Sequence, residues 1–297
     1  MIRTIDLEFQ RNACTIAAYA IDSIEAGLVL IETGPYTTFE NLKAELAAIN
    51  YQISDVKHVL LTHIHLDHAG AAWALAKLGA RIYVHPVGAP HLIDPSKLLE
   101  SARRIYQDQM ETLWGEIQPI PAEQVQTVEH EEEIKIGKLI FKAWHTPGHA
   151  KHHIAWQVDG IVFTGDVAGV QIGKGPVIAP LPPPDIDLEQ WEQSIELLRS
   201  LKPKALYLTH YGAVTNVADQ LDQLKESMYQ QANWVKDHMD NGRSAEEMVP
   251  LFEQLHEEAL TQMGFTEVEI EQYRAANPAG MSVQGLIRYW KSKIKQD

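Results

Sequence analysis

The segment from Thr62 to Gly70 constrains this chain more than any other, because it places three histidines and one aspartate within six consecutive positions. Imidazole and carboxylate groups bind zinc and related divalent ions. Without a cation, imidazoles crowded beside a carboxylate would each need a hydrogen-bonding partner of their own. The segment therefore indicates a metal centre, and we expect it to hold two ions. The four side chains are His63, His65, Asp67 and His68.

The sequence on either side places this cluster between a strand and a helix. Residues 56–61 form an apolar run with β-branched side chains, which is typical of a buried strand. Residues 69–78 have a helical pattern and are followed by Gly79, a common residue after the end of a helix. A connection of this kind presents side chains from a rigid scaffold without burying them in a core.

Composition restricts the class of protein and the kind of metal site. The formal net charge is −15, from 25 basic and 40 acidic residues, so we expect no nucleic-acid partner. Cys14 is the only cysteine, which excludes an internal disulfide and a cysteine-based zinc site. The N-terminus lacks the apolar region of a signal peptide, and no apolar run is long enough to span a bilayer. We therefore expect a cytoplasmic protein without a membrane partner.

The order of predicted elements favours a mixed α/β body followed by a helical region. The predicted boundary gives an α/β domain over 1–212 and a helical extension over 213–297. Residues 90–118 are predicted to be a largely helical insertion near the site. Apolar helices near 248–260 could form either a homodimer surface or an intrachain one. Strands are predicted at 2–9, 15–21, 27–31, 56–61, 81–85, 124–128, 139–144, 153–158, 161–164 and 205–208, and helices at 39–49, 69–78 and 188–201.

Three further candidate ligands follow predicted strands in the same way. His149, Asp166 and His210 each lie in a turn that ends an apolar run. A turn histidine or aspartate is by itself weak evidence, because such residues commonly cap helices or shape turns. If these strand ends share one edge of a sheet, however, their side chains converge on the 62–70 segment.

The ordered motifs resemble those of the metallo-β-lactamase-fold hydrolase superfamily. The signature HxHxDH is followed by a distant histidine, then an aspartate, then a histidine, and this chain matches it in order over about 1–212. The resemblance implies a four-layer αββα sandwich with its active site along one edge of the two sheets. It also implies that one metal takes His63, His65 and His149, that the other takes Asp67, His68 and His210, and that Asp166 bridges them.

Some residues near the signature depart from it or extend it. The family commonly has Asp-Thr-Gly where this chain has Glu32-Thr33-Gly34. This difference puts in doubt how the ligand side chains are held in place, but not that they are present. His153 matches a histidine seen near the site in the glyoxalase-II-like branch, and we expect it to support the ligands or position the substrate. The other candidate pocket residues are Tyr211, Lys174, Trp114 and Tyr106.

The resemblance predicts a hydrolase of the glyoxalase-II-like or lactonase-like branch acting on a small molecule. A hydroxide bridging two divalent ions would attack an ester, thioester or lactone carbonyl, with Asp67 and Asp166 as catalytic residues that orient it. The ligand types favour zinc, with iron or manganese as alternatives. Three other functions stay open: a phosphodiesterase or nuclease, a persulfide dioxygenase with a single iron, and a non-catalytic metal-binding scaffold.

Overall fold

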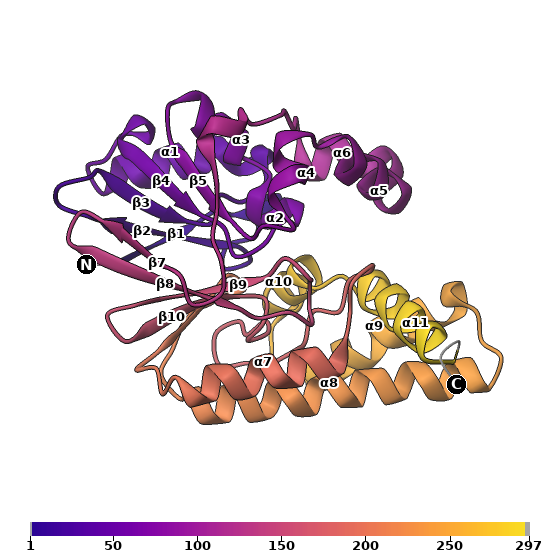
Figure 1. The fold of residues 1–297 in the computed structure, drawn as a ribbon. Helices are drawn as coiled ribbons and strands as arrows, with labels where there is room; N and C mark the ends of the chain where they lie inside the picture. The colour runs from indigo at the N-terminus through magenta and orange to yellow at the C-terminus, as the bar shows by residue number, and fades with distance from the viewer. Residues whose placement is uncertain (1, 295–297) are drawn as a thin grey trace.

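The structure of this protein, a computed structural model that describes residues 2–294, contains two six-stranded sheets stacked face to face. Helices cover the outer face of each sheet, so the molecule has four layers in the order αββα (Figure 1). This arrangement confirms the fold class predicted from the sequence.

The N-terminal sheet has the strand order β1-β2-β3-β4-β5-β6. Its first three strands pair antiparallel, and β3 to β6 pair parallel because helices connect them. Parallel neighbours present their carboxyl ends at the same edge, and this edge carries the 62–70 segment. The strands are β1 (Ile2–Asp6), β2 (Ala17–Asp22), β3 (Leu28–Ile31), β4 (Val56–Leu60), β5 (Arg81–Val84) and β6 (Val125–Thr127).

The second sheet has the order β12-β11-β10-β9-β8-β7. Only β10 and β11 pair parallel in it, and α7 (Leu188–Ser200) connects them. The sequence analysis missed β7 and β12, which are four and three residues long. The strands are β7 (Glu133–Ile136), β8 (Leu139–His145), β9 (Ile154–Val158), β10 (Ile161–Gly165), β11 (Leu206–Leu208) and β12 (Gly212–Val214).

Alternation along the strands distributes apolar side chains between separate cores. In β3, Val29 and Ile31 face the second sheet, whereas Leu28 and Leu30 face the outer helices. This two-residue period follows from strand geometry. It explains why β3 reads as a continuous apolar run rather than an alternating one, since both of its faces are buried.

Helices α1 to α6 lie over the N-terminal sheet and the edge that carries the site. The predicted helix 69–78 is in fact two helices, the first of which begins at Leu66 and so includes two of the candidate ligands. They are α1 (Phe39–Ala48), α2 (Leu66–Ala69), α3 (Ala72–Lys77), α4 (Ala89–Ile93), α5 (Ser96–Tyr106) and α6 (Met110–Trp114), with 3₁₀ turns at Phe9–Arg11, Tyr36–Thr38, Ile53–Asp55, Gln107–Gln109 and Ala122–Gln124.

The C-terminal helices pack onto the second sheet together with α7. Leu198 of α7, Leu224 of α8 and Leu286 of α11 belong to one apolar cluster. The division of the chain into a domain over 1–212 and a helical extension over 213–297 stays a prediction. Met1 and residues 295–297, which belong to these predicted ranges, lie outside the described residues. No helix within 2–294 combines the length and apolar character needed to cross a membrane. These helices are α8 (Val217–Asp240), α9 (Ala245–Gln262), α10 (Glu267–Ala276) and α11 (Ala279–Ile294).

Candidate metal centre

The seven side chains predicted as ligands lie together at one edge of the sandwich. Four loops and one short helix bring them there. The loop after β4 carries the first two, and α2 carries the next two. The loops after β8, β10 and β11 carry one each. They are His63, His65, Asp67, His68, His149, Asp166 and His210.

Three histidines form the first group. His65 Nδ1 is 3.0 Å from His63 Nε2 and 3.1 Å from His149 Nε2. Nitrogens bound to one tetrahedral zinc lie about 3.3 Å apart, given Zn–N bonds of about 2.0–2.1 Å. The three ring nitrogens are therefore spaced as ligands of one ion.

Asp67, His68 and His210 form the second group. Asp67 Oδ2 lies 3.5 Å from His68 Nε2 and 3.5 Å from His210 Nε2. Both imidazoles are buried, but the side chain of Asp67 is 24% exposed. Asp67 is therefore the ligand candidate of this group that is most open to solvent.

Asp166 lies between the two groups. Its Oδ2 is 3.3 Å from His149 Nε2, and its Oδ1 is 3.2 Å from His68 Nε2 and 3.4 Å from His210 Nε2. Each carboxylate oxygen thus faces one group. This is the geometry of a carboxylate that can bridge two cations.

The backbone before Asp166 depends on a glycine. Gly165 has a positive φ of 49°. A Cβ at this position would lie 2.7 Å from Thr62 Cβ and 2.8 Å from His153 Nε2. Such contacts are too close for any side chain, so only glycine lets β10 deliver Asp166 beside the 62–70 segment.

Four of the histidines use the ring nitrogen that faces away from the site to contact an outer partner. His149 Nδ1 contacts the Pro180 carbonyl at 2.9 Å, and His210 Nδ1 contacts the Thr15 carbonyl at 2.7 Å. Because a carbonyl only accepts, these Nδ1 atoms donate, which leaves each Nε2 with a free lone pair. The two other contacts are His63 Nδ1 to Thr62 Oγ1 at 3.0 Å and His68 Nδ1 to Glu32 Oε1 at 3.3 Å.

Glu32 takes the place where the family commonly has aspartate, and it supports the site. Its side chain is fully buried, accepts a hydrogen bond from Thr62 Oγ1 and contacts His68 Nδ1. The longer side chain therefore reaches the second group from the end of β3. The sequence analysis questioned this support, and the structure shows its contacts.

The two groups of ligand candidates differ in their electrostatic surroundings, which shift the histidine pKa values in opposite directions. Burial, together with neighbouring imidazoles, holds the pKa of His63 well below its usual range, so this ring is neutral and can act as a ligand. Burial also lowers the pKa of His68, but Asp67, Asp166 and Glu32 outweigh burial and raise it well above its usual range. The carboxylates around the second group thus stabilise positive charge there.

The residues fit a pair of divalent cations. Three ligand atoms are buried without a hydrogen-bond partner among the described residues: His68 Nε2, His210 Nε2 and Asp166 Oδ1. A buried polar atom without a partner is costly, and all three converge on the space between the groups. Nitrogen and carboxylate donors are what zinc, iron and manganese accept.

A family model agrees with this geometry. The model of the Metallo-beta-lactamase superfamily matches residues 11–210, which contain all seven ligand candidates. The chain belongs to the metallo-beta-lactamase superfamily. The superfamily membership predicted from the ordered motifs is confirmed.

Several known proteins are similar to this chain in sequence. The metallo-beta-lactamase fold-containing protein ST1585 of Sulfurisphaera tokodaii is 32% identical over 167 residues, 55% of this chain and 63% of that protein. An atrochrysone carboxyl ACP thioesterase of Aspergillus fumigatus is 28% identical over 66% of this chain and 50% of its own length. A hydroxyacylglutathione hydrolase of Methylobacterium is 26% identical over 69% and 62%. The chain thus spans one half to two thirds of the length of these relatives.

The same archaeal protein is also similar in structure. Its crystal structure superposes with a TM-score of 0.62 at 26% identity and covers 77% of this chain and 86% of its own.

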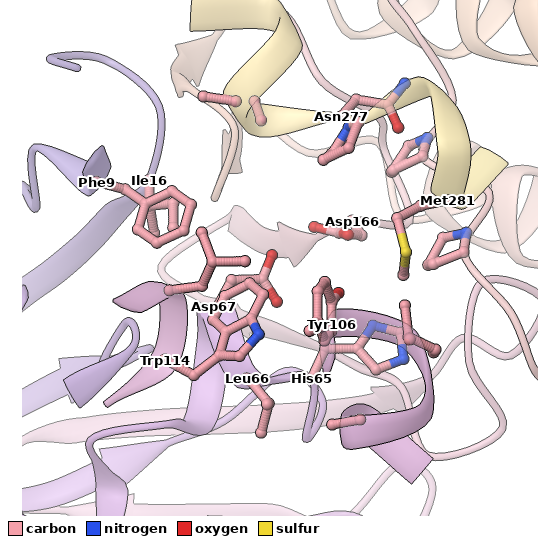
Figure 2. Close-up of a pocket in the computed structure, with 18 of the residues that line it drawn as sticks. Phe9, Ile16, His65, Leu66, Asp67, Tyr106, Trp114, Asp166, Asn277 and Met281 are labelled. Carbon is pink, nitrogen blue, oxygen red and sulfur yellow. The ribbon is translucent and has the colours of Figure 1, made fainter. Parts of the chain in front are cut away.

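A cavity opens from the metal centre of this superfamily member. Figure 2 shows Asp67 and Asp166 inside it, between Phe9 on one side and Met281 on the other. Tyr106 and Trp114, both predicted as pocket residues, line it. The apolar residues of the lining were not predicted from the sequence, because an apolar residue that faces a cavity has the same pattern as one that faces a core.

The three remaining candidates lie elsewhere. His153 is buried with its Nδ1 2.8 Å from Thr146 Oγ1, and its ring stacks on that of His63 with centroids 5.1 Å apart. Tyr211 lies beside Asp6 and Cys14, which together with burial raise its pKa. Lys174 is exposed. None of the three is among the described residues that line the cavity, and a substrate role for them stays a prediction.

Proposed function

We propose that this chain is a dinuclear metal-dependent hydrolase that cleaves an ester, thioester or lactone bond in a small molecule. One observation carries the proposal: the two oxygens of Asp166 face separate groups of ligand candidates at 3.2–3.4 Å. A bridging role is the simplest explanation for a carboxylate that is buried among five histidines. We propose zinc as the metal and the cytoplasm as the location.

The proposed ligand sets are those predicted from the sequence. His63, His65 and His149 would hold one ion, and Asp67, His68 and His210 the other. Asp166 would bridge them. Two divalent cations bound there would supply a water of lowered pKa as nucleophile and would polarise a carbonyl group.

The chain's own residues orient the reactants. The side chain of Asp67 is more exposed than that of Asp166, which is only 5% exposed, and both face the cavity. Burial raises the pKa of Asp67, but His68 and His210 outweigh burial and hold it well below its usual range, so the group stays ionised. We infer that the Asp67 carboxylate accepts a hydrogen bond from the attacking water and orients it. Burial raises the pKa of Asp166, but His68, His149 and His210 outweigh burial and lower it, so this carboxylate stays ionised. Asp166 therefore supplies negative charge to the site.

The class of bond is inferred from relatives and from the cavity. Two of the similar proteins are named as a carboxyl ACP thioesterase and a hydroxyacylglutathione hydrolase, and both names describe cleavage of an acyl compound. The net charge of −15 disfavours a phosphodiester backbone as substrate. An acyl compound is therefore proposed ahead of a nucleic acid.

Substitution of the bridging carboxylate tests the proposal. We expect Asp166→Asn to lower metal content and kcat/KM by more than about 100-fold, since even outer partners of ligands cost 10–100-fold. Exposed Asp159→Asn, at the turn before β10, is the matched control and should change neither. Metal analysis and turnover of thioesters, lactones and aryl esters provide the measurements. A variant that keeps two metals and full turnover would refute the bridging role.

Metal analysis, together with assays of oxygen consumption and phosphodiester turnover, separates the alternatives. One iron per chain with oxygen consumption would favour the persulfide dioxygenase. Turnover of phosphodiesters but not of acyl compounds would favour the nuclease. Two bound metals without turnover of either class would favour the scaffold.

A further inference from the structure

We propose that the cavity beside the metal centre binds the acyl group of the substrate and that this group is uncharged and apolar. The inference rests on the proposed hydrolase function and goes further, because it specifies the chemistry of the substrate. The cavity has a volume of about 150 Å³, and Asp67, Asp166 and His210 form part of its wall. A carbonyl placed at the metal centre would direct one of its two substituents into this space, and we assign the acyl group to it.

The cavity lies between two helical segments that are far apart in the sequence. Leu98 and Ile105 of α5 line one wall, and Ala276 of α10 and Met281 of α11 line the opposite wall. In Figure 1, α5 and α6 extend from the N-terminal half, and α10 and α11 belong to the C-terminal half. Apolar side chains face each other across the space, so an apolar group that fills it would be removed from water on both sides.

The charges of the lining argue against an ionised acyl group. The formally charged side chains among the described residues of the wall are Asp67 and Asp166, both proposed metal ligands, and no lysine or arginine lines it. An anionic group at the end of the acyl chain away from the metal centre would lose its hydration without gaining a counter-charge from the wall. Arg288 and Lys291 line a different cavity that shares only Pro183 with this one.

Helix α5 presents to the cavity an apolar face that the core covers only in part: Ala102 belongs to the apolar core and Leu98 packs against it. Leu98, Ala102 and Ile105 follow the i, i+4, i+7 spacing of one helix face. Only Ala102 of this helix is buried, whereas Leu98 and Ile105 are half-buried. Arg103 and Arg104 point to solvent. The face therefore keeps apolar area that a bound acyl group can cover.

The volume sets the size of the group. An apolar cavity of about 150 Å³ holds a benzene ring. We therefore expect the cavity to take an aromatic ring or a chain of about six carbon atoms.

A series of p-nitrophenyl esters with one leaving group tests the inference on metal-loaded protein. We expect kcat/KM to rise roughly fourfold for each added methylene from acetyl to hexanoyl, as burial of apolar area predicts, and then to level off. Glutaryl ester, which ends in a carboxylate, should be at least about tenfold poorer than pentanoyl ester.

Two substitutions at opposite walls should move the optimum in opposite directions. Ala102→Phe fills the cavity and should shift the optimum to shorter chains, whereas Met281→Ala enlarges it and should favour longer ones. Glu100→Phe adds the same ring to the exposed face of α5 and should leave the chain-length profile unchanged. Met281 is only half-buried, so its variant keeps the test intact if Ala102→Phe does not fold.

Binding without turnover separates this inference from the proposed function. Methyl alkyl ketones from 2-butanone to 2-octanone cannot be hydrolysed, and calorimetry measures their affinity for metal-loaded and metal-stripped protein. Binding that tightens with each methylene, and that is lost in Ala102→Phe, supports the apolar site even if no ester is cleaved. The absence of ester cleavage would refute only the hydrolase. Ester turnover with neither chain-length dependence nor ketone binding overturns the inference and leaves the hydrolase standing.

Discussion

Single residues determine how well the ligand atoms are aimed. Each imidazole of the centre needs one nitrogen free, and in four of the five an outer partner on the other nitrogen fixes that choice. For His68 the partner is Glu32, a buried carboxylate that also accepts a hydrogen bond from Thr62. Glu32 therefore orients His68 and adds negative charge that favours a cation.

We expect Glu32→Gln to weaken metal binding by about 10–100-fold while the fold is kept, because the amide preserves the shape but removes the charge. Competition with a chromophoric chelator measures the affinity, and circular dichroism checks the fold. Glu45→Gln on the exposed face of α1 is the control. Equal affinity in wild type and Glu32→Gln would show that the carboxylate is dispensable.

At the scale of elements, helix α7 supports two of the ligand loops at once. Trp191 donates a hydrogen bond to the Val167 carbonyl at 2.9 Å, and its ring lies 5.5 Å from that of His149. Gly148 has no room for a side chain because a Cβ there would collide with the Trp191 backbone. The helix thus fixes the loop after β8 and the loop after β10 relative to each other.

Trp191→Phe should lower the free energy of unfolding by about 1–3 kcal/mol, since the Val167 carbonyl loses its donor. It should also weaken metal binding, because the His149 and Asp166 loops lose a shared support. Trp290→Phe removes a similar hydrogen bond, to the Ala232 carbonyl at 2.8 Å, from α11 away from the centre. We expect a smaller loss of stability in that variant, because the Ala232 carbonyl lies within α8 and keeps its helical hydrogen bond, and unchanged metal affinity. Urea unfolding and chelator competition distinguish the two, and equal metal affinities would contradict the role of α7.

For the whole molecule, buried histidines make stability depend on pH. His152 is 8% exposed, and burial lowers its pKa to about 3 in the folded protein. The unfolded chain, with a pKa of about 6.5, binds more protons between these values, so the free energy of unfolding falls as the pH falls below about 6.5.

We expect His152 to reduce the stability of metal-stripped protein by about 1.4 kcal/mol between pH 7.5 and pH 5.5. His152→Gln should lose this contribution, so its urea-unfolding free energies at the two pH values should differ by that much less than those of wild type. Identical pH dependence in the two proteins would refute the assignment.

Local patterns in the sequence predicted most of the fold. Continuous apolar runs such as β3 and the helical periodicity of α1 are properties of neighbouring residues and need no distant contact. β7 and β12 were missed because neither contains a run of more than two apolar residues and because they owe their pairing to β8 and β11. The break after Leu66–Ala69 was missed because the helical pattern continues through Gly70.

The sequence by itself determined the identity of the ligand candidates, because each belongs to a short motif at the end of a strand, and strand ends are fixed by local pattern. Only the tertiary structure decided how these motifs converge, with Asp166 between two groups and Glu32 behind His68. Only the tertiary structure also revealed the apolar cavity. Its walls come from α5 and from α10 and α11, and which side chains of distant helices face one another depends on packing rather than on any local pattern.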